Sequence, residues 1–327
     1  MARWVLLVHG DSDGVCSGAI AKASLAKGGE DVNVVFTHPV GLAKDLAEFT
    51  QNGDNVLVAD VALNERELGA LESIVRERST HGRFIYIDHH PLPERALDLG
   101  HAELVHDTCC AASELTYRFF EKEGLIEEEY SRIALYGAIG DYVDETPWVR
   151  NALARWDKRG VYYEAGILVL GLERAGKNYE LKRRVVDSLS KNGLPSSDPE
   201  LFELAKHESA LEEELRLWVK QNVVVVGLVS VAREPRGSLG RAAHYARIYG
   251  NTPIGLAYER RGNMLIMSLR SDVVDLNRIL RAVSREMDIS GGGHDKAAGA
   301  RVEEHKFEEF LRRLSELAGE ELQRRVK

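Results

Sequence analysis

Three side chains that could bind metal ions or transfer protons follow one apolar run of the sequence. Residues 84–87 are aromatic or β-branched, and this composition predicts a buried β-strand. Asp88, His89 and His90 come directly after this run, and two prolines then prevent the strand from continuing. Because open α/β sheets bind ligands at the carboxyl ends of their strands, we expect the triplet to lie at a ligand site.

Three further apolar segments end in the same kinds of side chain. Residues 4–8 precede HGDSDG, residues 56–59 precede Asp60, and residues 133–139 precede Gly140 and Asp141. In HGDSDG, Asp11 and Asp13 are two residues apart, so an extended backbone would point both carboxylates the same way. Buried carboxylates repel one another, and a divalent cation removes that repulsion.

The pooled side chains exceed the number of ligands that one metal ion needs. The pool contains five aspartates and three histidines: Asp11, Asp13, Asp60, Asp88, Asp141, His9, His89 and His90. They suit two ions that share a carboxylate, separated by about 3.5–4 Å, as in many phosphoester hydrolases. Carboxylate oxygens with some imidazole favour manganese, magnesium or iron(II). The sequence therefore predicts a two-metal site, with Mn²⁺ as the first choice and Mg²⁺ as an alternative.

In family order, these segments resemble the motifs of the DHH phosphoesterase superfamily. HGDSDG is similar to the first motif, VAD to the second, IDHH to the third and GAIGD to the fourth. GGGH, at 291–294, resembles the loop of the associated substrate-binding domain, so the resemblance spans residues 1 to about 310. The superfamily includes RecJ-like single-strand exonucleases, nanoRNases with phosphoadenosine-phosphate phosphatase activity, cyclic-dinucleotide phosphodiesterases and family II pyrophosphatases.

The resemblance implies a role for each candidate in the first domain. Asp60 would bridge the ions and Asp11 would serve one of them. The other ion would be served by Asp13, His89 and Asp141, the last preferred to Asp144 because it ends the apolar segment.

Two histidines and one aspartate need separate consideration, because the resemblance does not make each of them a metal ligand. His9 lies two residues before Asp11, whereas several family branches place a histidine four before, so His9 either reaches the first ion or bonds to backbone. His90 would contact the scissile phosphoryl group as an imidazolium; the alternative is a partner that supports a metal ligand. Asp88 would orient neighbouring groups rather than bind metal.

A second set of candidates lies in the C-terminal part and would bind the substrate. Consecutive glycines, Gly291, Gly292 and Gly293, let backbone N–H groups approach a phosphate closely, and His294 can donate to a phosphate or base. About twenty residues earlier, Arg270 and Ser271 match the family's phosphate-binding arginine and serine, and Arg270 suits a phosphate through its bidentate fork.

Length and patterning predict an α/β protein of two domains, because 327 residues exceed one ordinary core. Residues 1–192 alternate strands and helices, which predicts a mainly parallel, doubly wound sheet. Residues 193–222 form a break and a linker helix. Residues 223–327 form a smaller α/β domain with one long strand at 223–231 and a flexible turn at 291–293.

Composition restricts the partners. The net charge of −9 excludes a broad basic surface for duplex and favours short or single-stranded nucleic acid, bound in a local groove. No apolar run reaches the length of a membrane span. We expect no signal peptide, because the apolar run at 4–8 is too short and two aspartates follow it. The three cysteines, Cys16, Cys109 and Cys110, are odd in number and argue for a reducing compartment, so we expect a cytoplasmic protein.

We expect a two-metal, Mn²⁺-dependent exonuclease that releases mononucleotides from single-stranded DNA or RNA, with the archaeal RecJ-like nucleases as the nearest branch and a possible role beside a repair or replication protein. One alternative is a nanoRNase or phosphoadenosine-phosphate phosphatase that degrades very short oligonucleotides. Another is a RecJ-like scaffold without catalysis, against which the complete motifs argue. DNA or RNA preference, polarity and oligomeric state stay open.

Overall fold

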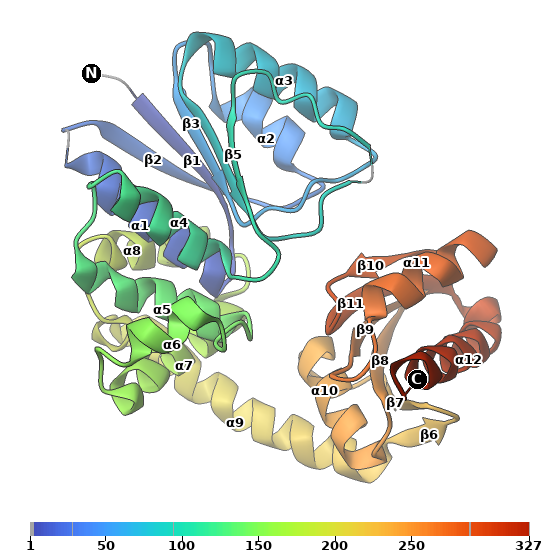
Figure 1. Ribbon diagram of the computed structural model, residues 1–327. Coiled ribbons are helices and arrows are strands. Elements are labelled where there is room, and N and C mark those ends of the chain that lie inside the picture. Colours follow the sequence, from blue (N-terminus) through green and yellow to red (C-terminus); the bar gives the residue numbers. More distant parts are fainter. Residues whose placement is uncertain (1–2, 28, 94, 288, 327) are drawn as a thin grey trace. The chain divides into compact units, whose positions relative to one another are not determined.

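The computed structural model describes residues 3–27, 29–93, 95–287 and 289–326. The chain divides into two compact units, Met1–Glu208 and Ser209–Lys327, and each unit contains one β-sheet with its own helices (Figure 1). The predicted α/β class and the parallel N-terminal sheet are confirmed. The division falls inside the long helix α9 (Pro199–Asn222), within the segment expected to link the domains.

The N-terminal unit is built on five parallel strands in the order β2-β1-β3-β4-β5. The strands are β1 (Arg3–His9), β2 (Asp31–Thr37), β3 (Asn55–Ala59), β4 (Phe84–Asp88) and β5 (Glu103–His106). The chain leaves β1 first toward β2 and then returns to its other side at β3, so the strand order reverses there. In doubly wound sheets such a reversal opens a crevice for ligands at the carboxyl ends of the two strands.

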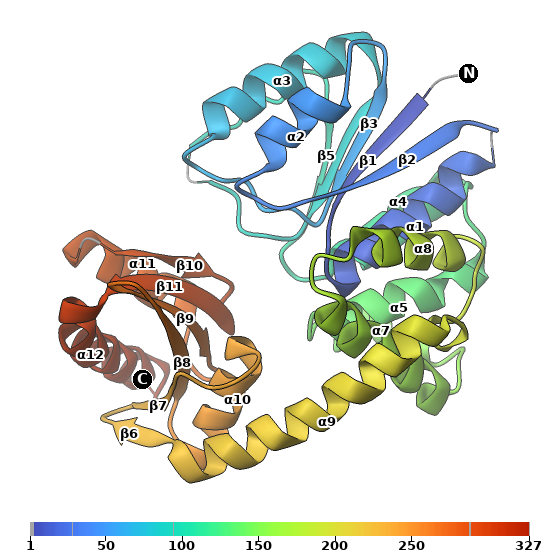
Figure 2. The same cartoon turned by 180° about the vertical axis from the view of Figure 1, so that it is seen from behind.

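Helices cover both faces of this sheet, which is why its strands are continuous apolar runs. In β1, Leu6 and Val8 face one layer while Val5 and Leu7 face the other, and all four side chains are fully buried. The first layer contains α1 (Ser12–Ala26), α4 (Ala112–Lys122) and α5 (Ser131–Gly140); the second contains α2 (Leu42–Phe49) and α3 (Leu68–His81) (Figures 1 and 2).

Further helices extend the first layer. They are the 3₁₀ turns η1 (Glu128–Tyr130) and η2 (Pro195–Ser197) and the helices α6 (Pro147–Leu153), α7 (Lys158–Ala175) and α8 (Tyr179–Leu189). The apolar segment 133–139 belongs to α5, so Asp141 follows a helix and not a strand like the other candidates. Small residues make this segment apolar enough to resemble the strands, but Ala and Leu favour a helix.

The C-terminal unit contains a six-stranded sheet in the order β10-β11-β9-β8-β7-β6, in which only β7 and β8 pair in parallel among the described residues. The strands are β6 (Val224–Val226), β7 (Val229–Arg233), β8 (Ile254–Arg261), β9 (Met264–Arg270), β10 (Ser290–Gly293) and β11 (Ala297–Glu303). One face packs on α11 (Leu276–Glu286) and α12 (Phe307–Val326), which η3 (Glu304–Lys306) precedes. The other packs on α10 (Leu239–Gly250) and the end of α9.

Two expectations about this unit are wrong. Residues 223–231 are not one strand, because the chain reverses at Gly227 and β6 pairs antiparallel with β7. Gly227 has a φ of 59°, which glycine adopts readily because it has no side chain. Residues 291–293 are not a flexible turn but the edge strand β10, in which Gly292 lies opposite Gly299 of β11. Glycine lowers strand propensity but keeps both backbone hydrogen-bonding groups, and β11 satisfies them.

None of the helices among the described residues is both long enough and apolar enough to cross a lipid bilayer.

We expect Gly137→Ala to destabilise the protein by about 1–3 kcal/mol, measured by urea unfolding. Gly137 lies in α5, where a Cβ would come within 2.3 Å of Ser113 Oγ and 2.6 Å of Asp13 Oδ1. The matched control is Gly166→Ala in α7, where a Cβ would meet no atom within 4 Å, and helix propensity alone predicts a gain of about 0.5–1 kcal/mol. Equal stability of the two variants would contradict the close packing of α1, α4 and α5.

Candidate metal centre

The structure gathers all the predicted metal ligands at the carboxyl end of the N-terminal sheet. His9 ends β1, Asp60 directly follows β3, and His89 directly follows β4. The remaining three come from helix ends: Asp11 is the N-cap of α1, Asp13 lies in its first turn, and Asp141 is the C-cap of α5. These residues therefore lie at the carboxyl ends of β1 and β3, where the strand order reverses and doubly wound sheets bind their ligands.

Two groups of possible ligands lie on the two sides of the Asp60 carboxylate. In the first, His9 Nδ1 lies 2.7 Å from Asp11 Oδ2 and 3.8 Å from Asp60 Oδ2. In the second, His89 Nε2 lies 3.4 Å from Asp60 Oδ1, 3.5 Å from Asp141 Oδ2 and 4.0 Å from Asp13 Oδ2. The ligand atoms of each group, His9–Asp11–Asp60 and Asp13–His89–Asp141, lie within 4.8 Å of one another. Because the two oxygens of Asp60 face different groups, its carboxylate has the geometry of a bridge.

Asp60 itself is in an unfavourable state without a cation. Its side chain is 3% exposed, and its Oδ2 has no hydrogen-bond partner among the described residues. Burial, together with the charges of Asp11, Asp13 and Asp141, raises the pKa of Asp60 well above its usual range. Its backbone has φ of 60°, a left-handed conformation that few residues other than glycine adopt. A divalent ion would satisfy the orphaned oxygen and neutralise the repulsion, so the residues fit a metal site.

Helix α4 fixes the orientation of Asp13. The backbone N–H groups of Ala112 and Ser113 donate to Asp13 Oδ2 and Oδ1 at 2.7 and 3.0 Å. A helix N-terminus is a favourable partner for a carboxylate, and it leaves further lone pairs for a cation. Burial nevertheless raises the pKa of Asp13. Burial and the charges of Asp13 and Asp11 raise the pKa of Asp141 to about 8.

The two adjacent histidines differ in electrostatics. Burial lowers the pKa of His89, which favours the neutral imidazole that metals bind. Burial alone would also lower the pKa of His90, but the hydrogen bond to Asp88 and its charge raise it. His90 Nδ1 lies 2.8 Å from Asp88 Oδ1, and Asp88 is 1% exposed.

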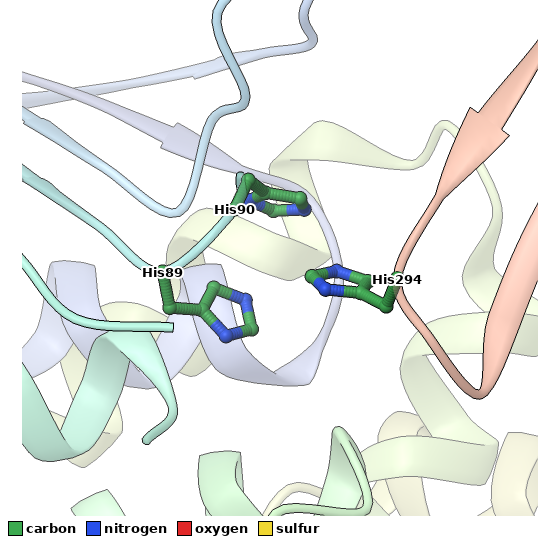
Figure 3. Close-up of side chains that lie close together, drawn as sticks. All are labelled: His89, His90 and His294. Carbon is green, nitrogen blue, oxygen red and sulfur yellow. The ribbon is translucent and has the colours of Figure 1, made fainter. Parts of the chain in front are cut away.

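Figure 3 shows His89 and His90 as neighbours on the segment after β4, their ring centroids 4.7 Å apart and their planes inclined by 70°. His106 Nε2 lies 2.7 Å from the His90 carbonyl oxygen and holds this segment to the end of β5. Asp60, Asp88 and His90 could also hold an ion as a third group. The contact between Asp88 and His90 instead matches the orienting role expected for Asp88.

Lys182 of α8 is a residue of this site that the sequence analysis missed. Its Nζ donates to the Gly10 carbonyl oxygen, and its side chain is buried although charged. It also lines a pocket of about 490 Å³ together with His9, Asp11, Asp141 and Tyr179. A signal was present, because Lys182 occupies the apolar face of its helix, three, four and seven residues before buried Val185, Val186 and Leu189.

The predicted substrate-binding residues lie together within the C-terminal unit. Arg270 ends β9 opposite Ala297, and Gly293 ends β10 opposite Ala298, so Arg270 and the 291–294 segment lie on the two sides of β11 at one end of the sheet. Ser271 is 1% exposed, and its hydroxyl oxygen accepts the N–H groups of Val273 and Val274 at 3.2 and 3.1 Å. Ser271 therefore stabilises the turn after β9, and its contact with a substrate stays a prediction.

Comparison with known proteins agrees with this architecture. Residues 221–320 match the family model of the DHHA1 domain. The uncharacterized protein MJ0831 of Methanocaldococcus jannaschii is 38% identical over 74 residues, which cover 21% of this chain and 17% of that protein.

Two solved structures share the fold. RecJ from Thermus thermophilus, in complex with Mn²⁺, matches with a TM-score of 0.69 and 18% identity over 97% of this chain and 52% of RecJ. The pGpG-specific phosphodiesterase PggH from Vibrio matches with a TM-score of 0.58 and 13% identity over 98% of this chain and 100% of PggH. This chain thus spans about half the length of that RecJ. The C-terminal part of the chain thus matches the DHHA1 domain, and the whole described chain has the fold of RecJ and PggH.

Proposed function

We propose that this protein is a metal-dependent phosphodiesterase that removes mononucleotides from the ends of single-stranded DNA or RNA. The observation that carries the proposal is the bridging carboxylate of Asp60, whose oxygens face two ligand groups while one of them has no partner among the described residues. Phosphoester hydrolases commonly use two ions that share a ligand in this way.

The chain provides a ligand set for each ion. His9, Asp11 and Asp60 would hold one, and Asp13, Asp60, His89 and Asp141 the other. Oxygen-rich sets with imidazole suit Mn²⁺, with Mg²⁺ as the alternative. When bound, such a pair supplies an activated water and positive charge beside the phosphoryl oxygens. The neutral form of His89 and the fixed carboxylate of Asp13 prepare the second set before any ion enters.

His90 and Asp88 would provide the protein's own proton donor. Asp88 fixes the ring through Nδ1 and favours its protonated form. An imidazolium in this position can donate to a phosphoryl oxygen or to the leaving oxygen of the scissile bond. The pair therefore resembles the oriented histidines of other hydrolases, in which a buried carboxylate sets the tautomer and the direction of the ring.

Binding of a nucleotide chain would also need the C-terminal unit. Arg270 and the backbone of β10 present donors at one end of its sheet, where a phosphate of a single strand could bind. The net charge of −9 disfavours extended contact with duplex, so accessible single-stranded ends are the better substrate. A repair or replication protein as partner stays a prediction.

A second candidate function is the degradation of very short oligonucleotides. PggH, a pGpG-specific phosphodiesterase, shares the fold over its full length. A scaffold without catalysis is disfavoured by the complete ligand set around Asp60.

The first prediction concerns activity. With Mn²⁺, we expect the wild type to release mononucleotides from end-labelled single strands of about 20 nucleotides, and Asp13→Ala and His89→Ala to lose at least about 100-fold in rate because each removes a metal ligand. DNA and RNA, labelled at either end, are compared with dinucleotides. Cleavage confined to dinucleotides would replace the exonuclease by the second candidate, and no cleavage by the wild type would leave the scaffold.

The second prediction concerns metal and stability. In the metal-free protein the folded pKa of Asp141, about 8, exceeds the unfolded value, so the folded state binds more protons between these pKa values and loses stability as the pH rises through this window. Mn²⁺ replaces those protons. We therefore expect Mn²⁺ to raise the melting temperature more near pH 8 than near pH 5, in thermal unfolding with and without a chelator.

Asp60→Asn and Asp54→Asn form a matched pair for this experiment. Asp60 follows β3 and Asp54 precedes it, and both side chains are buried. Asp60→Asn removes a repelling charge and tolerates the left-handed backbone, so the metal-free variant should melt above the wild type near pH 8 but respond weakly to Mn²⁺. Asp54→Asn, which weakens the contact with the Gln51 N–H and removes the ion pair with Arg3, should keep the full response. Identical behaviour of the pair would refute the bridge.

The third prediction separates catalysis from metal binding. We expect His90→Asn to lower kcat by about 100- to 10,000-fold, as for other positioned proton donors, while the stabilisation by Mn²⁺ is retained. Asp88→Asn should show a smaller loss of kcat, because the ring remains but loses its orientation. If His90→Asn abolishes the shift in melting temperature with Mn²⁺, His90 is a metal ligand in the third group and not a proton donor.

A further inference from the structure

Tyr142, which directly follows Asp141, has a backbone conformation that tyrosine seldom adopts. Its φ is 58°, and it occupies the first position beyond the C-cap of α5. The N–H of Tyr142 donates to Ile139 O at 3.2 Å, and the N–H of Val143 donates to Ala138 O at 2.9 Å. This pair of bonds is the Schellman motif, in which the left-handed position is usually glycine because any Cβ is crowded there. A tyrosine at this position weakens the fold.

Contacts within the chain do not explain the choice of residue. The Tyr142 side chain is 79% exposed, more than any other large hydrophobic side chain among the described residues. The described residues include four other non-glycine residues with positive φ. Asp60 belongs to the candidate metal centre, and Asn192 and Asn251 are of the type that tolerates this conformation best. Glu234 is the remaining case, so Tyr142 is the one aromatic ring held in this way.

The exposure of the ring is not a consequence of a loose loop. Asp144, two residues after Tyr142, accepts a hydrogen bond from the Tyr162 hydroxyl of α7 through its Oδ2 at 2.9 Å. Thr146 Oγ1 donates to Glu114 Oε2 in α4 at 2.8 Å, and it also caps α6. The loop 141–146 is thus attached to three helices, so the backbone of Tyr142 is held in place directly after Asp141. A tyrosine side chain has only two rotatable bonds, so it loses little conformational entropy when its ring binds a flat partner.

The charges of the loop indicate which part of a nucleotide meets the ring. Asp144 and Glu145 follow Tyr142, and Asp141 precedes it, so a strand phosphate without a cation would be repelled here. A nucleobase is uncharged, and every base offers a face to an aromatic side chain. Stacking is therefore the contact that this acidic loop can provide.

We propose that Tyr142 is a stacking residue for a nucleobase of the substrate strand, next to the phosphate that is bound beside Asp141. The proposal rests on the proposed function, because it requires a nucleotide at the metal centre. It adds a specificity element, since an aromatic platform selects nucleotides over inorganic phosphates and tolerates every base sequence.

The test is binding of fluorescent single strands of five thymidines to the full chain, in the His90→Asn background with Mn²⁺ so that turnover is slow. We expect Tyr142→Gly to weaken binding about 10- to 100-fold, and Tyr142→Phe and Tyr142→Trp to keep the affinity of tyrosine. We also expect an effect in a series of strands that each lack one base. The parent protein should bind one of these abasic strands as weakly as Tyr142→Gly binds the intact strand. The parent protein and Tyr142→Gly should bind that abasic strand with equal affinity.

Thermal unfolding of the same variants excludes a structural explanation. Because glycine suits the left-handed position, Tyr142→Gly should melt at the same temperature as the parent or up to about 4 °C higher, although it binds more weakly. Tyr163→Ala, an exposed tyrosine in regular helix α7, should leave binding unchanged. Glu234→Gly relieves the same backbone conformation in the other unit and should not change affinity.

The stacking proposal is overturned if Tyr142→Gly binds the thymidine strand as tightly as the parent, or if the variant melts well below it. Those results would leave the proposed function untouched when the wild type still cleaves single strands. If the wild type cleaves no strand and no variant binds one, the proposed function fails, and the stacking proposal fails with it.

Discussion

Repulsion among buried carboxylates at the ends of β1 and β3 is the constraint on which the rest of the site depends. Asp60 is 3% exposed and lies among four other aspartates whose charges raise its pKa. Protons or cations must balance these charges, and the neighbouring hydrogen bonds already occupy Asp11 and Asp13. One oxygen of Asp60 remains without a partner in the described residues. The folded state tolerates this repulsion because burial of the surrounding apolar core contributes more free energy than the repulsion costs.

Close packing of helices holds these charges together. A Cβ on Gly14 would come within 2.3 Å of the His9 carbonyl oxygen, and one on Gly140 within 2.1 Å of Ser12 Oγ. Glycine at these positions lets the start of α1 lie against β1 and the end of α5 lie against the start of α1. Because the carboxylates of Asp11, Asp13 and Asp141 are attached to these helix ends, the small residues set the distances within the ligand groups.

The sequence predicted which side chains come together better than it predicted the elements that carry them. Alternation of strands and helices, with acids at the ends of apolar runs, was enough to place His9, Asp60 and His89 at one edge of a sheet. Residues 133–139 before Asp141 were expected only as an apolar segment, because apolarity does not distinguish a buried helix from a strand, and the structure places them in α5. Lys182 was not predicted, since its burial depends on α8 packing against the turn at Gly10, a contact between residues 172 apart in sequence.

Tyr142 adds to this picture because it shares the left-handed backbone conformation of Asp60 and directly follows Asp141 of the second ligand group. Each lies in the left-handed region, and each follows the end of an element, β3 or α5. Local propensity would favour glycine or asparagine at both positions. Strain that persists without compensating contacts usually marks a residue that acts on something outside the chain. For Asp60 that partner would be a cation, and for Tyr142 a flat uncharged group, so the two residues together describe a ligand with a charged end and an aromatic end, as a nucleotide has.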